Sequence, residues 1–241
     1  MLLHASWEDV VFLHFIVAPQ LLRRRLPDSL RLDRPLGEAW ITLTAMRSRG
    51  PAPLPPRLLR GVPSFAQVNL RTYVVGEDGE PGLFFLDQAV SSGTMAAASR
   101  LFGLHQHGAD VSVKRDGDAI SVSLEQDCEG DEHEPAPFGE HAHLSLRVRV
   151  AGPTLRATHD PIGRALLERY VGYDGLPPRK TRVEHAPWVV QSLDIEEFES
   201  SGLLPEGARL AAAQYGTPRV VAVGIPHGLA IETAMPIAQP A

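Results

Sequence analysis

The segment 64–76 alternates between two kinds of side chain, and this pattern constrains the fold more than any other feature of the sequence. Successive side chains of a β-strand point to opposite faces, so the pattern predicts a strand between two different environments. One face carries Phe65, Gln67, Asn69, Arg71 and Tyr73, and the other carries Ala66, Val68, Leu70, Thr72 and Val74. Periodicity alone favours a polar face turned to water, and the alternative is a polar face turned into a cavity.

Turn residues around this segment indicate β-hairpins. Gly, Asp and Pro in 76–82 form a turn, and the apolar residues 83–86 return as a partner strand. Asp116 and Gly117 predict a second hairpin between strands at 110–114 and 119–124, because Asp-Gly accepts the positive φ angles of a tight turn. Further strands are expected at 38–46, 142–150, 181–194 and 209–223, and helices at 20–25, 94–102 and 161–170.

Many strands and three short helices predict a mainly β protein of the α+β kind, an antiparallel barrel or sandwich with a few helices packed on it. Asp160 is expected as the N-cap of the last helix, with Pro161 at its first position. Because no Ser/Gly-rich linker divides the chain, we expect one domain over residues 1–226. Residues 227–241 are rich in Pro and Ala, which predicts a loose tail.

Composition limits the partners and the compartment. A net charge of −6 opposes binding to nucleic acid. The apolar stretch 10–18 follows Glu8 and Asp9 and is interrupted by His14, so neither a signal peptide nor a membrane span is expected. A lone cysteine, Cys128, cannot form an internal disulfide and has acidic neighbours, which favours a cytoplasmic protein over a thiol enzyme.

Strong cofactor signatures are missing from the sequence. It contains no glycine-rich dinucleotide fingerprint, phosphate-binding loop, nucleophile elbow or paired CxxC motif, so no cofactor is expected. Two groups of histidines, His105 with His107 and His133 with His141 and His143, could begin a metal site. Neither group has a clear set of further ligands, so no metal is expected either.

The polar face of 64–76 offers the clearest binding chemistry. The planar guanidinium of Arg71, flanked by the amides of Gln67 and Asn69, could hold a carboxylate or an enolate inside a barrel. His185 and Trp188 could lie at the wall of such a cavity, although a tryptophan packed beside a hydrogen-bonded histidine is the commoner arrangement.

An ordered series of motifs between about Ser6 and Pro226 resembles the YqjF-like family of unknown function, which belongs to the acetoacetate decarboxylase-like superfamily. The most specific part is Asn-Leu-Arg-Thr-Tyr-Val at 69–74 with Pro-Gly-Leu-Phe-Phe at 81–85. The other motifs are Trp7, His14, Gly-Glu-Ala-Trp at 37–40, Arg-Leu-Phe-Gly-Leu at 100–104, Glu-Arg-Tyr at 168–170, His185 and Pro-Trp at 187–188. The resemblance implies a cone-shaped antiparallel barrel with an internal cavity, and it turns the polar face of 64–76 inward.

The resemblance also allows a comparison with the catalytic lysine of acetoacetate decarboxylase. Acetoacetate decarboxylase forms a Schiff base through a lysine that follows a segment similar to 100–107, and here that place falls on Gln106, or on His107 if the alignment shifts by one. Neither side chain forms an imine. The sequence has two lysines, Lys114 beside a turn and Lys180 in an expected loop, where an amine keeps a high pKa. We therefore expect no Schiff-base decarboxylase.

Three classes of function are compatible with these residues and motifs. The favoured one is a binding protein for a small anionic or carbonyl metabolite, with a ligand site formed by Arg71, Asn69, Gln67, Gln106 and Trp188. The second is a lyase or hydrolase in which Arg71 stabilises an enolate or carboxylate and His14, His105 or His185 carries the proton. The third is a protein-interaction module that uses the arginine-rich segment 47–60 or the acidic segment 125–141. A homo-oligomer is compatible with all three.

Overall fold

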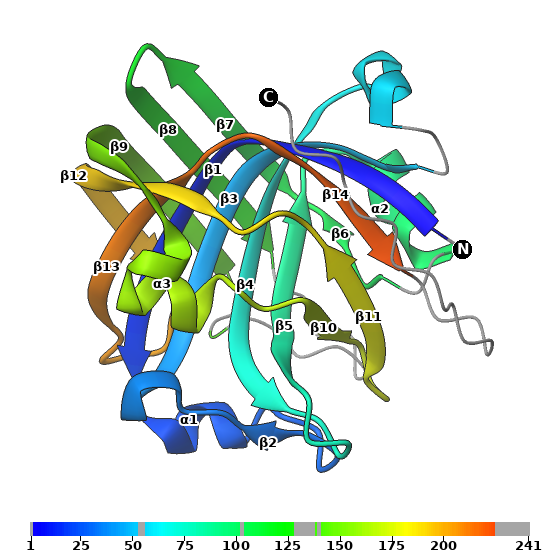
Figure 1. The fold of residues 1–241 in the computed structure, drawn as a ribbon, viewed down its shortest axis with the longest axis vertical. Coiled ribbons are helices and arrows are strands. Elements are labelled where there is room, and N and C mark those ends of the chain that lie inside the picture. The colour runs from blue at the N-terminus through cyan, green and yellow to red at the C-terminus, as the bar shows by residue number, and fades with distance from the viewer. Residues whose placement is uncertain (1, 53–55, 102–103, 128–137, 139–140, 225–241) are drawn as a thin grey trace.

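A closed barrel of seven strands forms the centre of the molecule (Figure 1). A computed structural model describes residues 2–52, 56–101, 104–127, 138 and 141–224. Around the barrel the strands are β1 (Leu2–Val17), β3 (Ala39–Ala52), β4 (Phe65–Val75), β5 (Pro81–Val90), β10 (Val171–Asp174), β11 (Arg179–Glu184) and β14 (Arg219–Gly224). The expected mainly β barrel is confirmed, and its strands pair antiparallel except for the parallel pair of β5 and β10.

A second set of strands continues the sheet beyond β1. It consists of β13 (Arg209–Gly216), β12 (Val189–Ser201), β9 (His141–Arg156), β8 (Ala119–Asp127) and β7 (Asp110–Asp116). β1 belongs to both sets because it changes partner near Asp9, which has a φ of 51° beside a β-bulge. The Asp9 carboxylate accepts a hydrogen bond from Nε of Arg47 at 2.6 Å and pairs with Arg115 at 3.4 Å.

The main hydrophobic core lies between the barrel wall and the second set of strands. Val68 and Leu70 on the outer face of β4 pack in one cluster with Val113 of β7 and Leu144 of β9. The inner face is buried too, since Gln67 and Asn69 are each only 5% exposed. The expectation from periodicity alone, a polar face turned to water, is therefore wrong, because this strand separates a core from a cavity.

Within the described ranges three short α-helices accompany the strands, as expected: α1 (Pro19–Arg23), α2 (Gly93–Leu101) and α3 (Pro161–Leu166). Asp160 caps α3 by accepting a hydrogen bond from the Gly163 N–H at 2.6 Å. Leu166 of α3 packs in a cluster with Trp40 and Tyr73, and so α3 covers one end of the barrel. The short remaining elements are strands β2 (Arg31–Leu32) and β6 (His107–Gly108) and 3-10 helices at Pro35–Gly37, Pro56–Gly61 and Ala157–His159.

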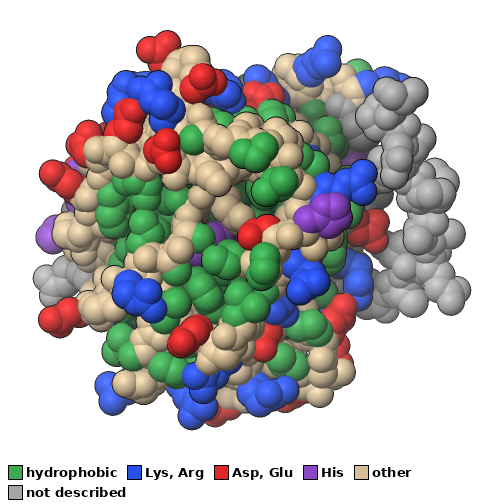
Figure 2. All heavy atoms as spheres, turned by 60° about the vertical axis from the view of Figure 1, so that its left-hand side comes forward, with side chains coloured by type: hydrophobic (Ala, Val, Ile, Leu, Met, Phe, Trp, Pro, Cys, Tyr) green, Lys and Arg blue, Asp and Glu red, His purple; other side chains and the backbone are tan. Residues whose placement is uncertain are grey.

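Figure 2 shows the side of the molecule that carries α3 and β12. Hydrophobic side chains gather there in several patches, and charged side chains lie between and around them. No helix in the described ranges combines the length and the apolar composition needed to cross a bilayer.

Several predicted element bounds are corrected by the structure. The strands expected at 181–194 and 209–223 are each two strands, interrupted near Pro187 and Pro218, which have no N–H to donate to a sheet. The helix expected at 161–170 ends at Leu166, four residues before β10 begins at Val171. β1 and β10 were not predicted as strands. Cys128, His133 and the tail 227–241 lie outside the described residues, and the single-domain assignment stays a prediction.

Candidate functional site

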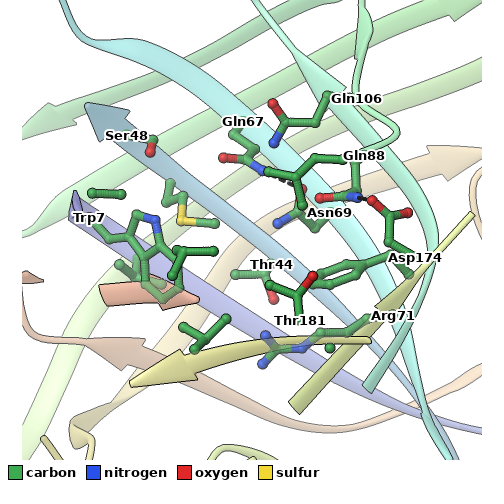
Figure 3. Close-up of a pocket in the computed structure, with 18 of the residues that line it drawn as sticks. Trp7, Thr44, Ser48, Gln67, Asn69, Arg71, Gln88, Gln106, Asp174 and Thr181 are labelled. Atoms are coloured by element: carbon green, nitrogen blue, oxygen red, sulfur yellow. Dashed lines mark hydrogen bonds between the residues drawn. The ribbon is translucent and has the colours of Figure 1, made fainter. Parts of the chain in front are cut away.

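A cavity of about 100 Å³ lies inside the barrel (Figure 3). A single water needs roughly 10–15 Å³ on the same measure, so the space admits a small organic molecule. Its polar lining consists of Thr44, Ser48, Gln67, Asn69, Arg71, Gln88, Gln106, Asp174 and Thr181. Its apolar lining consists of Ala5, Trp7, Val10, Phe12, Met46, Phe85, Leu104, Gly172, Val183, Trp188 and Val223.

Strand register explains why residues of β4 and β5 meet in the cavity. Arg71 lies opposite Phe85, and Asn69 lies opposite Gln88. Phe85 and Gln88 are three residues apart on β5. Both can face inward because β5 has a bulge of one extra residue opposite Leu70 and Arg71 of β4. Without this extra residue in β5, alternation would send one of the two side chains to the opposite face.

Among the described residues that line the cavity, Arg71 carries the cationic side chain. Its guanidinium carbon lies 5.4 Å from the centre of the Phe12 ring. Burial lowers the pKa of the Arg71 guanidinium, although an arginine remains protonated in proteins. Within the described part of the chain no carboxylate forms an ion pair with Arg71, and its Nε has no hydrogen-bond partner. A buried donor of this kind favours an acceptor that enters the cavity.

Three amides predicted as ligand groups line the same cavity. Gln67 donates from Nε2 to Oδ1 of Asn69 at 2.8 Å, so the two side chains hold each other in place. Gln106 is 5% exposed, and its Oε1 has no hydrogen-bond partner among the described residues. Gln106 therefore faces the cavity, whereas His107 contacts Asp87 through Nε2 at 2.7 Å and does not line it.

Trp188, the last predicted ligand residue, also lines the cavity. Its ring lies edge-on to Phe12 at 5.0 Å and stacks on Trp7 at 6.2 Å between ring centres. The guanidinium of Arg219 covers it at 3.6 Å. The two tryptophans give one wall of the cavity a rigid aromatic surface, and both rings would sense a bound ligand.

Asp174 is a cavity residue that no sequence pattern indicated. It is 3% exposed, and its Oδ2 accepts hydrogen bonds from Nε2 of Gln88 at 3.0 Å and from the N–H of His105 at 2.7 Å. The residue ends the four-residue strand β10, which is too short to show a periodic pattern. Only the adjacent Gly175, with a φ of 75°, marks a turn there.

The three candidate histidines are not among the described residues that line the cavity. His14 is fully buried, with Thr42 Oγ1 at 2.9 Å from Nδ1 and Gln214 Oε1 at 3.2 Å from Nε2. Burial, with a smaller contribution from the Arg71 charge, lowers the pKa of His14 to about 3. The ring is therefore neutral at pH 7, and Nε2 carries the proton that the Gln214 oxygen accepts.

His105 and His185 lie beside the cavity. His105 lines a neighbouring small pocket, with Nδ1 3.6 Å from Oδ2 of Asp174. His185 donates from Nδ1 to the Ala186 carbonyl at 2.8 Å and packs on Tyr170, with 4.7 Å between ring centres. Burial lowers the pKa of His185 to about 4. A catalytic role for any of the three histidines stays a prediction.

Neither lysine lies in the cavity. Lys114 is exposed on β7. Lys180 lies on β11 rather than in the expected loop, because its strand pairs with β10, and its ammonium contacts Asp78 and Glu80. Those hydrogen bonds raise the pKa of Lys180, which keeps the amine protonated. No group of three or more His, Cys, Asp or Glu side chains that could hold a metal occurs among residues the structure describes.

A closed barrel with a polar internal cavity defines the class of the protein, and comparison with known proteins defines its family. Residues 4–224 match the family DUF2071, described as "Uncharacterized conserved protein (COG2071)", and the chain belongs to this family. A relative is the uncharacterized protein YqjF of Bacillus subtilis (strain 168). It is 28% identical over 203 residues, which cover 81% of this chain and 77% of YqjF. The YqjF-like assignment is thereby confirmed.

Solved structures with the same fold are acetoacetate decarboxylase-like proteins. Acetoacetate decarboxylase from Legionella pneumophila superposes with a TM-score of 0.59 at 12% identity, covering 92% of this chain and 85% of the enzyme. The enduracididine biosynthesis enzyme MppR, complexed with pyruvate, gives a TM-score of 0.58 at 16% identity, covering 92% and 88%. At these identities the likeness shows the acetoacetate decarboxylase-like fold.

Proposed function

We propose that this protein binds a small metabolite bearing a carboxylate or oxo group in the barrel cavity and does not use Schiff-base chemistry. One observation carries the proposal: the Arg71 guanidinium lines the cavity, and although it interacts with Tyr73, its Nε has no hydrogen-bond partner among the described residues. An arginine can bind a carboxylate through two parallel hydrogen bonds, and such bonds are strong where water is excluded. A cytoplasmic location belongs to the same proposal.

The neighbouring groups suit such a ligand. Gln67 and Asn69 lie on the same face of β4 as Arg71, and each amide can orient a bound oxygen. The rings of Phe12 and Trp188 line the same cavity and exclude water from part of its wall. The pyruvate complex of MppR, a protein of the same fold, makes a 2-oxo acid a reasonable first probe.

Arginine variants test the proposal. Tryptophan fluorescence titrations with pyruvate and acetoacetate would compare the wild type with Arg71→Met and Arg71→Lys. Loss of a charged hydrogen-bond donor costs about 1.5–3 kcal/mol, so affinity for both anions should fall roughly ten- to a hundredfold in Arg71→Met. Arg71→Lys should recover only part of it, because an ammonium cannot donate two parallel bonds.

Arg149→Met is the matched control, because Arg149 is exposed on β9 and pairs with Glu196 at 2.7 Å. This variant should bind like the wild type. Should Arg71→Met instead lower the melting temperature by several degrees while the affinity of the folded protein stays the same, Arg71 would serve the fold and the proposal would be wrong. Absence of binding in the wild type, with both probes at millimolar concentration, would also contradict it.

An enzyme is the second candidate, and the position of Asp174 favours it. A buried carboxylate in the same cavity as Arg71 could take a proton from a carbon next to a carbonyl group while Arg71 stabilises the enolate. The interaction-module alternative gains less support from the structure. Arg47 and Arg49 of the arginine-rich segment pair within the chain, with Asp9 at 2.6 Å and Glu8 at 3.8 Å respectively.

A further inference from the structure

Asp174 lines both the cavity and the small pocket beside it, and its hydrogen bonds to other described residues use only one carboxylate oxygen. Hydrogen bonds from Gln88 and from the N–H of His105 both go to Oδ2, and the ring of His105 also lies nearest Oδ2. No contact recorded within the described residues falls on Oδ1. Oδ1 is not among the described side-chain atoms that are fully buried without a partner, so it stays accessible. A ligand that displaces water from this oxygen must supply a donor in its place, because a desolvated charge without a hydrogen bond is costly.

A second acceptor lies in the same cavity. Oε1 of Gln106 is buried and has no partner in the described part of the chain. Figure 3 shows the side chains of Gln106, Gln88 and Asp174 grouped on one side of the pocket, with Arg71 on another. The cavity therefore has a donor end at Arg71 and an acceptor end at Asp174 and Gln106.

Strand register places the two ends within reach of one small molecule. Arg71 pairs with Phe85, and the parallel register of β5 with β10, in which Tyr173 lies beside Phe84, brings Asp174 alongside Phe85. Two strand spacings amount to about 10 Å between backbones, and both residues line the pocket. Gly172 on β10 leaves room for the ring of Phe85, because a Cβ added at Gly172 would lie only 3.1 Å from that ring.

We infer that the ligand is bifunctional: its carboxylate binds Arg71, and a hydroxyl or protonated amino group at its other end donates to Asp174, with Gln106 beside it. This inference rests on the proposed function and adds to it the chemistry of the second ligand group. A ligand with only a carboxylate would place its apolar end against a buried anion. A donor at that end instead satisfies Oδ1 and offsets the cost of burying the charge.

A series of carboxylates with and without a terminal donor tests the inference. Isothermal titration calorimetry on the wild-type chain would compare butanoate with 4-hydroxybutanoate and 4-aminobutanoate, and propanoate with 3-hydroxypropanoate and 3-aminopropanoate. At the length that spans the cavity, a donor-bearing member should bind roughly ten- to a hundredfold tighter than its parent, as expected of a hydrogen bond to a charged group. The hydroxyl and amino arms show which donor the site takes.

Asp174→Asn tests the residue assignment. The amide keeps an acceptor oxygen for the His105 N–H but loses the charge, so the preference for the amino compound over its parent should fall to within about threefold. Asp87→Asn is the matched control, because Asp87 lies on β5 outside the cavity and contacts His107. This control should keep the wild-type preference.

The outcomes separate the two proposals. If the parent acids bind as tightly as every donor-bearing member at both lengths, the inference is wrong, while binding of the parents would still support the proposed function. If neither pyruvate nor any member of the series binds, both are wrong. The wild-type comparison decides the inference even if Asp174→Asn does not fold, and an unchanged preference in a folded Asp174→Asn would overturn the role of Asp174.

Discussion

The buried ring of His14 should make the protein lose stability in mild acid. The imidazole lies between Thr42 and Gln214, and burial holds its pKa at about 3 against 6.5 for an ordinary histidine. The unfolded chain therefore binds a proton at His14 between these two pH values, and the folded chain does not. Folding stability is fully present above pH 6.5 and is lost progressively as the pH falls from 6.5 toward 3.

The size of the effect follows from the two pKa values. One proton contributes a slope of about 1.4 kcal/mol per pH unit inside the window. The free energy of unfolding should therefore fall by about 2 kcal/mol between pH 8 and pH 5, and most of this loss occurs below pH 6.5. A loss of this size is a large part of the usual stability of a domain, so it is measurable by chemical unfolding.

Urea unfolding at pH 8 and pH 5 measures the effect. His14→Gln removes the titrating group and keeps an amide that can reach Thr42 or Gln214, so its loss of unfolding free energy between the two pH values should be about 2 kcal/mol smaller than in the wild type. His143→Gln is the control, because His143 is partly exposed on β9 and contacts Glu125. If the wild type and His14→Gln lose the same free energy, His14 is not held neutral and the reasoning fails.

Two further predictions concern the cavity. Borohydride in the presence of acetoacetate should leave the wild-type mass unchanged, whereas Gln106→Lys should be trapped selectively at residue 106, because the enclosed site and the charge of Arg71 both lower the pKa of a lysine there. Peptide mapping that finds this lysine no more reactive than Lys114 would place residue 106 in solvent. If the enzyme alternative holds, the wild type should exchange the methyl protons of pyruvate for deuterium in D₂O, as followed by NMR, and Asp174→Asn should exchange at least a hundredfold more slowly. Exchange equal to the buffer rate would exclude this chemistry on pyruvate.

Local patterns predicted the strands well and their surroundings poorly. Alternation in 64–76 indicated β4 and its two faces, and Asp-Gly at 116–117 indicated the hairpin of β7 and β8. Periodicity shows that two faces differ but not what lies against them. The inward direction of Arg71 followed from the family resemblance, because β7 and β9, which cover the other face, come later in the chain.

The candidate site was predicted in part for a similar reason. Gln67, Asn69, Arg71, Gln106 and Trp188 were placed by motifs, and all five line the cavity. Asp174 lies on a four-residue strand whose parallel pairing with β5 connects distant segments, and no local signal records such a pairing. The histidines were chosen for their chemistry, which does not show whether a ring faces a cavity or a hydrogen-bond partner such as Gln214.

The two faces of β4 have different roles: the outer face packs in the hydrophobic core, and the inner face contributes polar side chains to the cavity. Its outer side chains hold the barrel against β7 and β9, so changes there cost stability by leaving cavities in a packed core. On its inner face Gln67, Asn69 and Arg71 line the cavity, where an amide can be exchanged for a carboxylate or a smaller group without disturbing that packing. Selection can thus alter ligand chemistry and structural stability almost independently. A barrel wall of this kind allows one fold to carry different pocket chemistries in sequences that share few residues.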